Sequence, residues 1–153
     1  MKTISTVIIY ALLSSLMALS AEECSRDSKP WREIASGSQS NIEQATRQVI
    51  QNQEQWRKWW EEHIDGKIVP KPAPKVDFEQ ETVLAATLGR HSTGGYAIRF
   101  TEIRRQGDQL TAVLQTKSPG SEDMVTMALT SPFAVIATPK HTGRVEFIEK
   151  AAK

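Results

Sequence analysis

The side chains that could bind a metal or act as a catalytic base are few and widely separated. The three histidines are His63, His91 and His141, and none has a cysteine or another histidine at metal-ligand spacing. The Gly-x-Ser-x-Gly elbow, the P-loop and the dinucleotide-binding glycine motif are all absent from the sequence. A triad assembled from residues distant in sequence would leave no such motif. The sequence predicts a non-enzyme without catalytic, cofactor-binding or metal-ligating residues.

The most distinctive polar stretch runs from Gly89 to Ile98 and reads GRHSTGGYAI. Its adjacent glycines, Gly94 and Gly95, stand directly before Tyr96, where a pattern typical of a strand begins. Glycine permits a tight turn, or the close approach of another chain, because it has no Cβ. Two interpretations therefore remain open: an ordinary turn between strands and a partner-binding loop.

Length and charge exclude several classes of protein. The chain has 153 residues, 19 Lys and Arg against 18 Asp and Glu, and a single cysteine. This length is typical of one domain. The balanced charge provides no basic surface for nucleic acid, and one cysteine cannot form an internal disulfide.

Hydrophobic residues are concentrated at the beginning of the chain. After Lys2, the apolar run over residues 4–19 ends in Ala18-Leu19-Ser20-Ala21, with small residues at the spacing that a signal peptidase accepts. The run has about 16 residues, whereas a spanning helix needs roughly 20, which argues against an uncleaved anchor helix. We expect residues 1–20 to be a signal peptide. The mature protein is then exported, periplasmic or extracellular, and without stable membrane insertion.

Directly after this segment, the acidic residues Glu22 and Glu23 precede Cys24. A bacterial lipoprotein signal places small residues at these positions, so the sequence argues against a lipid anchor at Cys24. The expected organisation is a flexible leader over residues 21–30, a single domain over 31–149 and a tail over 150–153.

A helix is predicted after Asn52, which is a good N-cap residue, with Gln55 at the third helical position of a capping box. Gly66 is expected to end this helix. Four aromatic residues follow at helical spacing and share one face: Trp56, Trp59, Trp60 and His63. Such a stripe packs against a core more often than it binds a ligand. A partner interface is the alternative, because tryptophan is common at binding hot spots.

The remainder of the sequence is dominated by strand patterns. Residues 70–75 alternate proline with lysine and alanine, which favours an extended segment. A slip in the alternation between Phe100 and Ile103 predicts a β-bulge near Thr101 and Glu102. The predicted strands cover residues 31–36, 44–51, 82–89, 96–105, 109–116, 124–130, 133–138 and 144–148. We expect an α+β, mostly β fold: an antiparallel β-sandwich or barrel of about six to eight strands with one N-terminal Trp-rich helix packed on it.

Several short motifs follow one another in order along the proposed domain. They are Trp56-x-x-Trp59, Val76-Asp77-Phe78, Leu88-Gly89, Thr93-Gly94-Gly95-Tyr96, Ser131-Pro132-Phe133 and Pro139-Lys140. In order and spacing, from about Trp31 to Phe147, the chain resembles the PrcB C-terminal-like domain. This resemblance implies a bacterial exported protein. It also implies a relation to a small subunit that associates with and stabilises a secreted protease complex, in a family without established catalytic residues.

Two functions agree with this resemblance and with the residues. The first is a protein-binding accessory domain that contacts a secreted protease through Thr93, Gly94, Gly95, Tyr96 and Pro132. The second is a protease inhibitor, because Thr93-Gly94-Gly95-Tyr96 is similar to the Thr-Gly-aromatic loop of chagasin-like cysteine protease inhibitors. The chain lacks the Arg-Pro-Trp element of those inhibitors, which makes inhibition the alternative.

Overall fold

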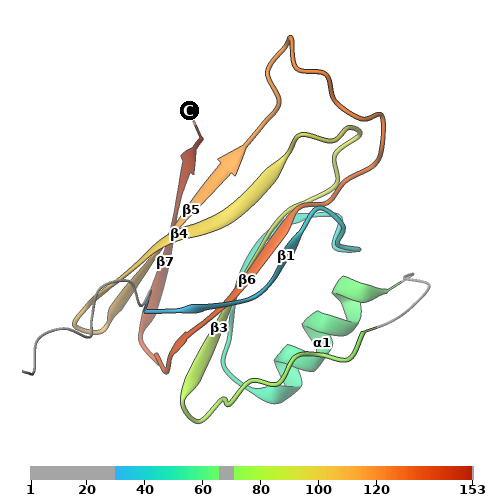
Figure 1. The fold of residues 1–153 in the computed structure, drawn as a ribbon. Helices are drawn as coiled ribbons and strands as arrows, with labels where there is room; N and C mark the ends of the chain where they lie inside the picture. Colours follow the sequence, from blue (N-terminus) through green and yellow to red (C-terminus); the bar gives the residue numbers. More distant parts are fainter. Residues whose placement is uncertain (1–29, 66–70, 153) are drawn as a thin grey trace, which may run out of the picture.

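The computed structural model describes residues 30–65 and 71–152. The predicted signal peptide, Cys24, Gly66 and all but the last residue of the predicted leader lie outside the described residues. The described chain forms seven strands and one helix (Figure 1). These are β1 (Arg32–Gly37), β2 (Ala45–Ile50), α1 (Gln53–Ile64), β3 (Glu81–Leu88), β4 (Ala97–Gln106), β5 (Gln109–Lys117), β6 (Phe133–Pro139) and β7 (Arg144–Ala151). No helix among these residues is long and apolar enough to cross a membrane.

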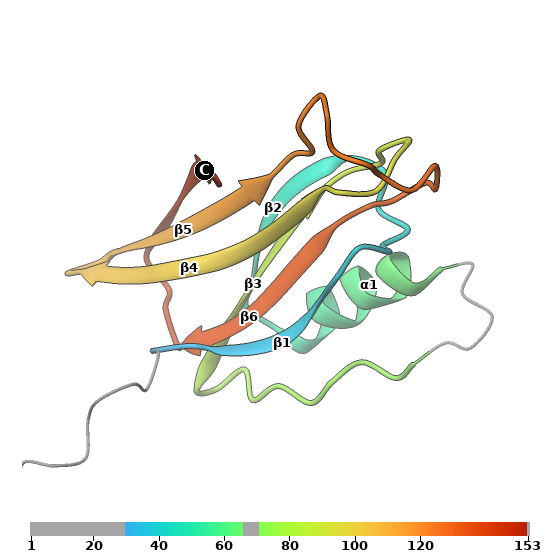
Figure 2. The same cartoon turned by 45° about the horizontal axis from the view of Figure 1, so that its top comes forward.

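The strands form two separate sheets. One has four strands in the order β1-β6-β3-β2, and the other has three in the order β4-β5-β7. Figures 1 and 2 show α1 on one side of the four-stranded sheet and the three-stranded sheet on its other side. The predicted mostly β sandwich with one packed helix is therefore confirmed, and the barrel alternative is wrong because the sheets do not close on each other.

The four-stranded sheet is buried on both faces, as its inner strand β3 illustrates. Val83 and Ala85 pack in a cluster with the tryptophans of α1, whereas Leu84 and Ala86 pack in a second cluster with the three-stranded sheet. Successive side chains of a strand point to opposite faces. A strand covered on both faces is thus apolar along most of its length, and every residue from Thr82 to Thr87 is buried.

Helix α1 begins as its sequence predicts. The side chain of Asn52 accepts a hydrogen bond from the amide of Gln55 at 2.9 Å, and Gln55 Oε1 accepts one from the amide of Gln51 at 3.1 Å. The first bond satisfies an amide of the first helical turn, and the second satisfies the amide of the residue before the N-cap Asn52. Trp56 is fully buried, and Trp59 and Trp60 are nearly so. The aromatic face of α1 is therefore core and does not form a surface.

The proline-rich segment after α1 is held against the tryptophans. Trp56 Nε1 donates a 3.0 Å hydrogen bond to the carbonyl oxygen of Pro74, and Trp60 Nε1 donates a 2.8 Å bond to that of Lys71. Ala73 and Val76 pack against the same apolar cluster. Residues 71–76 contain no helix or strand, and the indole N–H groups fix their position beside the helix.

Two features of the sheets differ from the sequence prediction. Residues 124–130 are not a strand: apart from a single bridge at Thr130, they form a connection between β5 and β6. Strand β7 pairs with β5 in parallel orientation, although an antiparallel sandwich was expected. The reason is that β6 lies in the other sheet, so the chain reverses there before it returns beside β5. The predicted bulge is confirmed by a register shift between Phe100 and Glu102.

Candidate functional site

Two connections between the sheets lie together at one end of the sandwich. Residues 89–96 lead from β3 to β4, and residues 118–132 lead from β5 to β6 (Figure 1). We call these two segments the paired loops. His91 and Thr130 exchange backbone hydrogen bonds of 2.7 and 2.9 Å, which fix one loop to the other. The paired loops thus form a single ordered surface.

The glycines of the first loop allow the second loop to approach closely. The amide of Gly94 donates a 2.9 Å hydrogen bond to the carbonyl of Thr126. Thr130 Oγ1 donates a 2.7 Å bond to the carbonyl of Thr93. Gly95 has a φ of +88°, which residues with a Cβ rarely adopt. The polar stretch singled out in the sequence therefore contacts a segment of its own chain.

The remaining predicted partner-binding residues differ in exposure. The Tyr96 ring stacks on the imidazole of His91, with ring centroids 3.8 Å apart and an interplanar angle of 11°. Tyr96 and Thr93 are half-buried and Gly95 is exposed, so this loop contributes to the surface. Pro132 is buried, and its carbonyl accepts a 2.9 Å hydrogen bond from the amide of Leu88. Pro132 therefore supports the paired loops from beneath.

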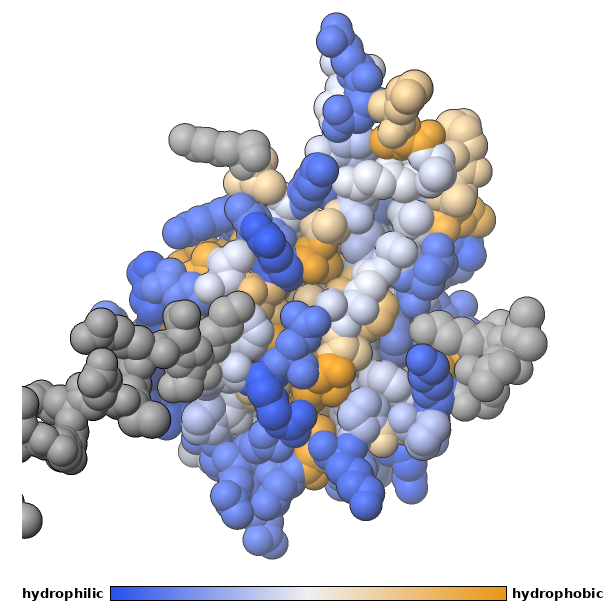
Figure 3. All heavy atoms as spheres, in the orientation of Figure 1, coloured by the Kyte–Doolittle hydropathy of each residue, from blue (hydrophilic) through white to orange (hydrophobic). Residues whose placement is uncertain are grey.

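Three large apolar side chains project from the second loop. Met124 and Met127 are 103% and 87% exposed, and Leu129 is 59% exposed. Figure 3 shows pale and orange side chains gathered at the upper right, over the segment that Figure 1 draws in orange. Among the described residues only one other large hydrophobic side chain is exposed, Ile148 on β7, and its exposure is lower, at 38%. A cluster of exposed apolar residues on a protein surface is typical of an interaction site.

Sequence reasoning missed these three residues for a definite reason. Residues 124–130 read MVTMALT, a mostly apolar run between turn residues, and such a run predicts a strand. In the structure the segment has no sheet to join, so its apolar residues remain in solvent. The turn before them, where the amide of Gly120 donates a 2.8 Å bond to Asp123 Oδ2, precedes a strand as readily as a loop and could not distinguish the two.

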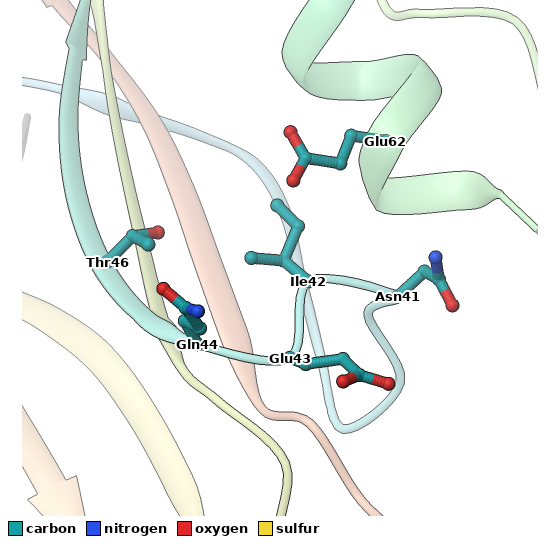
Figure 4. A pocket seen from close by; sticks show the side chains of 6 residues that line it. All are labelled: Asn41, Ile42, Glu43, Gln44, Thr46 and Glu62. Carbon is teal, nitrogen blue, oxygen red and sulfur yellow. The ribbon is translucent and has the colours of Figure 1, made fainter.

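A shallow hollow of about 350 Å³ lies between α1 and the residues that lead into β2. Figure 4 shows Glu62 reaching from α1 toward Ile42, whereas the other labelled side chains come from residues 41–46. Glu43 pairs with Arg90 at 2.8 Å, and Thr46 Oγ1 lies 3.0 Å from Thr87 Oγ1. The lining residues include no histidine or cysteine. The hollow thus brings together carboxylate, amide and hydroxyl groups without an imidazole or a thiol.

The described residues contain no candidate metal site. No group of three or more His, Cys, Asp or Glu side chains within residues 30–65 and 71–152 is placed to hold a metal ion. The paired loops are therefore the candidate functional site, and their chemistry is that of contact: apolar side chains on an ordered backbone.

The fold and the site together define a helix-covered β-sandwich that presents a loop surface. Residues 82–139, which extend from β3 to β6 and include both paired loops, match the family PrcB C-terminal. This match confirms the predicted resemblance to a PrcB C-terminal-like domain. The family is an accessory type of domain without a known catalytic role. No significant match was found among curated proteins or among solved structures.

Proposed function

We propose that this protein is a non-catalytic accessory domain that binds a protein partner through the paired loops, and that its partner is a secreted protease or protease complex. The observation that carries this proposal is the exposure of Met124, Met127 and Leu129 within the segment that matches the accessory family. The predicted signal peptide over residues 1–20 supports export to the periplasm or the extracellular space.

The construction of the loops favours protein binding. Backbone hydrogen bonds at Gly94 and His91 order the second loop before any partner arrives, which lowers the entropy lost on association. Methionine side chains adapt to irregular apolar surfaces, so Met124 and Met127 can fit a partner's groove. The adjacent acidic residues Glu122 and Asp123 are exposed. The complementary surface is therefore an apolar groove with basic residues at its margin.

Binding of this kind would stabilise the partner. A domain that binds only the folded form of a protease shifts its folding equilibrium toward that form by mass action. The partner then remains active and survives longer. The alternative, inhibition through Thr93–Tyr96, has less support because the backbone of Thr93 and Gly94 is already bonded to Thr130 and Thr126.

The test compares two surface variants in affinity capture from the exported fraction. The loop variant replaces Met124, Met127 and Leu129 with serine, and the control replaces Ile148, the exposed apolar residue on β7, with serine. We expect the loop variant to lose at least about tenfold in capture, because truncation of one hot-spot residue costs about 2 kcal/mol or more and a tenfold loss needs only about 1.4 kcal/mol. The control should capture the same proteins as the wild type.

Two outcomes would contradict the proposal. If the loop variant keeps its fold and captures the same proteins as the wild type, the paired loops are not the contact surface. If the captured protease loses its activity in the complex, the protein is an inhibitor. An accessory domain should leave the protease active and lengthen its half-life, whereas an inhibitor should block a papain-like enzyme.

A further inference from the structure

The methionines are distributed unevenly along the chain. There are four, at positions 1, 17, 124 and 127, and the first two lie in the predicted signal peptide. The described residues therefore contain only Met124 and Met127, three positions apart in the same exposed loop. Their side chains are 103% and 87% exposed, so both thioether sulfurs are open to solvent.

The described domain has no other sulfur. The single cysteine of the chain, Cys24, lies outside the described residues, and the two apolar clusters contain no methionine. Susceptibility of a thioether to oxidants follows its exposure. We therefore expect a mild oxidant to react at the paired loops and to leave the packing of the sandwich unchanged.

We propose that Met124 and Met127 form an oxidation site for hydrogen peroxide, and that their conversion to sulfoxides switches the paired loops from a binding to a non-binding state. In each step the sulfur lone pair attacks one peroxide oxygen, the S–O bond forms and the O–O bond breaks. The hydroxide that leaves takes up the proton of the transferred oxygen and departs as water. The sulfur loses two electrons and the peroxide gains two.

The switch follows from the polarity of the product. A sulfoxide is polar and chiral, so it disrupts contacts that an apolar thioether makes. Leu129 is the only other large apolar side chain exposed on the described part of this loop. After oxidation of both methionines, it is the only one of the three that can still make apolar contacts with a partner. Methionine sulfoxide reductases reverse the reaction, so the binding state can be restored. This inference rests on the proposed function, because the switch acts on the same surface.

The chemical part of the test needs no partner. The purified protein is treated with hydrogen peroxide, and digestion with mass spectrometry should locate an increase of about 16 Da at each of the two methionines. Both should react within about threefold of the rate of free methionine, because neither is shielded. Retention on a hydrophobic-interaction column should fall after oxidation and return after reductase treatment, while the thermal midpoint stays unchanged. The matched control, Met124→Leu with Met127→Leu, should keep its retention in peroxide.

The binding part uses the same samples in affinity capture. We expect peroxide to reduce capture by the wild type at least about tenfold, as loss of hot-spot contacts does, and to leave capture by the double leucine variant unchanged. Oxidation more than about tenfold slower than that of free methionine, or an equal shift in the leucine variant, would overturn the site. Unchanged capture by fully oxidised wild type would overturn the switch. If untreated protein captures nothing, the proposed function fails, whereas the mass and retention measurements still decide the oxidation site.

Discussion

Gly94 and Thr126 approach so closely that a methyl group on the glycine has no room. The amide of Gly94 donates to the carbonyl of Thr126 at 2.9 Å, and a Cβ on Gly94 would lie 2.5 Å from Thr126 Oγ1. We predict that Gly94→Ala lowers the free energy of unfolding by about 1–3 kcal/mol, since either the Thr126 side chain must leave its rotamer or one loop must move away from the other. Chemical denaturation of the purified variant measures this loss.

The same contact provides a compensating variant. A Cβ on Gly94 would lie 3.7 Å from Thr126 Cβ, which is an ordinary contact distance. Thr126→Ala removes the hydroxyl and should therefore restore most of the stability lost in Gly94→Ala. If Gly94→Ala lowers the free energy of unfolding by the same amount in the wild type and in the Thr126→Ala variant, crowding at Thr126 is not the cause.

Trp56 and Trp59 differ in one hydrogen bond, and this difference predicts their roles. Trp56 Nε1 donates to Pro74, whereas Trp59 Nε1 is buried without a partner among the described residues. We predict that Trp56→Phe costs about 1–3 kcal/mol more than Trp59→Phe, because it removes a bond and leaves the carbonyl of Pro74 without a donor. Denaturant unfolding of the two variants measures the difference.

Hydrogen exchange provides a second measurement on this pair. Amides near residues 71–76 should exchange faster in Trp56→Phe, since the indole bond no longer holds that segment. Trp59→Phe is the matched control, with the same loss of volume from the same helix face. Identical exchange in both variants would show that the apolar contacts alone hold the segment.

Arg32 and Glu81 form a two-bonded ion pair that makes stability depend on pH. Both nitrogen–oxygen distances are 2.8 Å, and these bonds to Arg32 are the main cause that lowers the pKa of Glu81 from its ordinary value of 4.5. A carboxylate with a lowered pKa contributes stability above its unfolded-state pKa and loses it as the pH falls through its folded-state pKa. Because Arg32 is 48% exposed, we expect less than about 1 kcal/mol.

The measurement is the free energy of unfolding from neutral pH to below pH 4.5, the ordinary pKa of Glu81. Glu81→Gln should be less stable than the wild type at neutral pH, and the two should converge as the pH falls below that value. Glu79→Gln is the control, because Glu79 is exposed and forms no ion pair within the described residues. A constant difference between Glu81→Gln and wild type at all pH values would contradict this account.

Gly143 lies where β7 begins its parallel pairing with β5. A Cβ there would overlap the carbonyl oxygen of Asp108, which accepts a 3.1 Å hydrogen bond from the amide of Arg144. We predict that Gly143→Ala lowers the free energy of unfolding by about 1–3 kcal/mol, because backbone must shift to make room. In Gly120→Ala the new methyl group would have only ordinary contacts, at 3.6 Å or more, so this variant should remain near wild-type stability. A similar small loss in both would contradict the prediction.

The elements that depend on local pattern could be predicted from the sequence. The cap at Asn52, the aromatic face of α1 and the bulge after Phe100 each have a signature within a few residues, and the structure contains all three. The adjacent glycines of the first loop were also recognised as permitting close approach. The absence of a Cβ on Gly94 permits close contact with Thr126 of the other loop. The local sequence could not identify this contact, because β4 and β5 lie between the two residues along the chain.

The features that were missed depend on which sheet each strand joins. A short apolar run such as residues 124–130 has the same appearance in a strand and in an unpaired connection, so the sequence could not reveal that Met124 and Met127 are exposed. Parallel pairing of β7 depends on the chain crossing between sheets on either side of β6, which leaves no local signal. Burial of Pro132 is a tertiary feature too, because its carbonyl accepts a hydrogen bond from Leu88 at the end of β3, which lies far away in the sequence.

The path of the chain through the paired loops has a mechanical consequence. Residues 118–132 join β5, the middle strand of its sheet, to β6, an inner strand of the other sheet. A pulling force applied at Met124 therefore enters both layers at once, and in each layer it reaches a strand with hydrogen-bonded neighbours on both sides. Unfolding by such a force must break the backbone hydrogen bonds of β5 and of β6 together. Neither sheet can be opened first from an edge strand, because both strands that bear the force are inner strands.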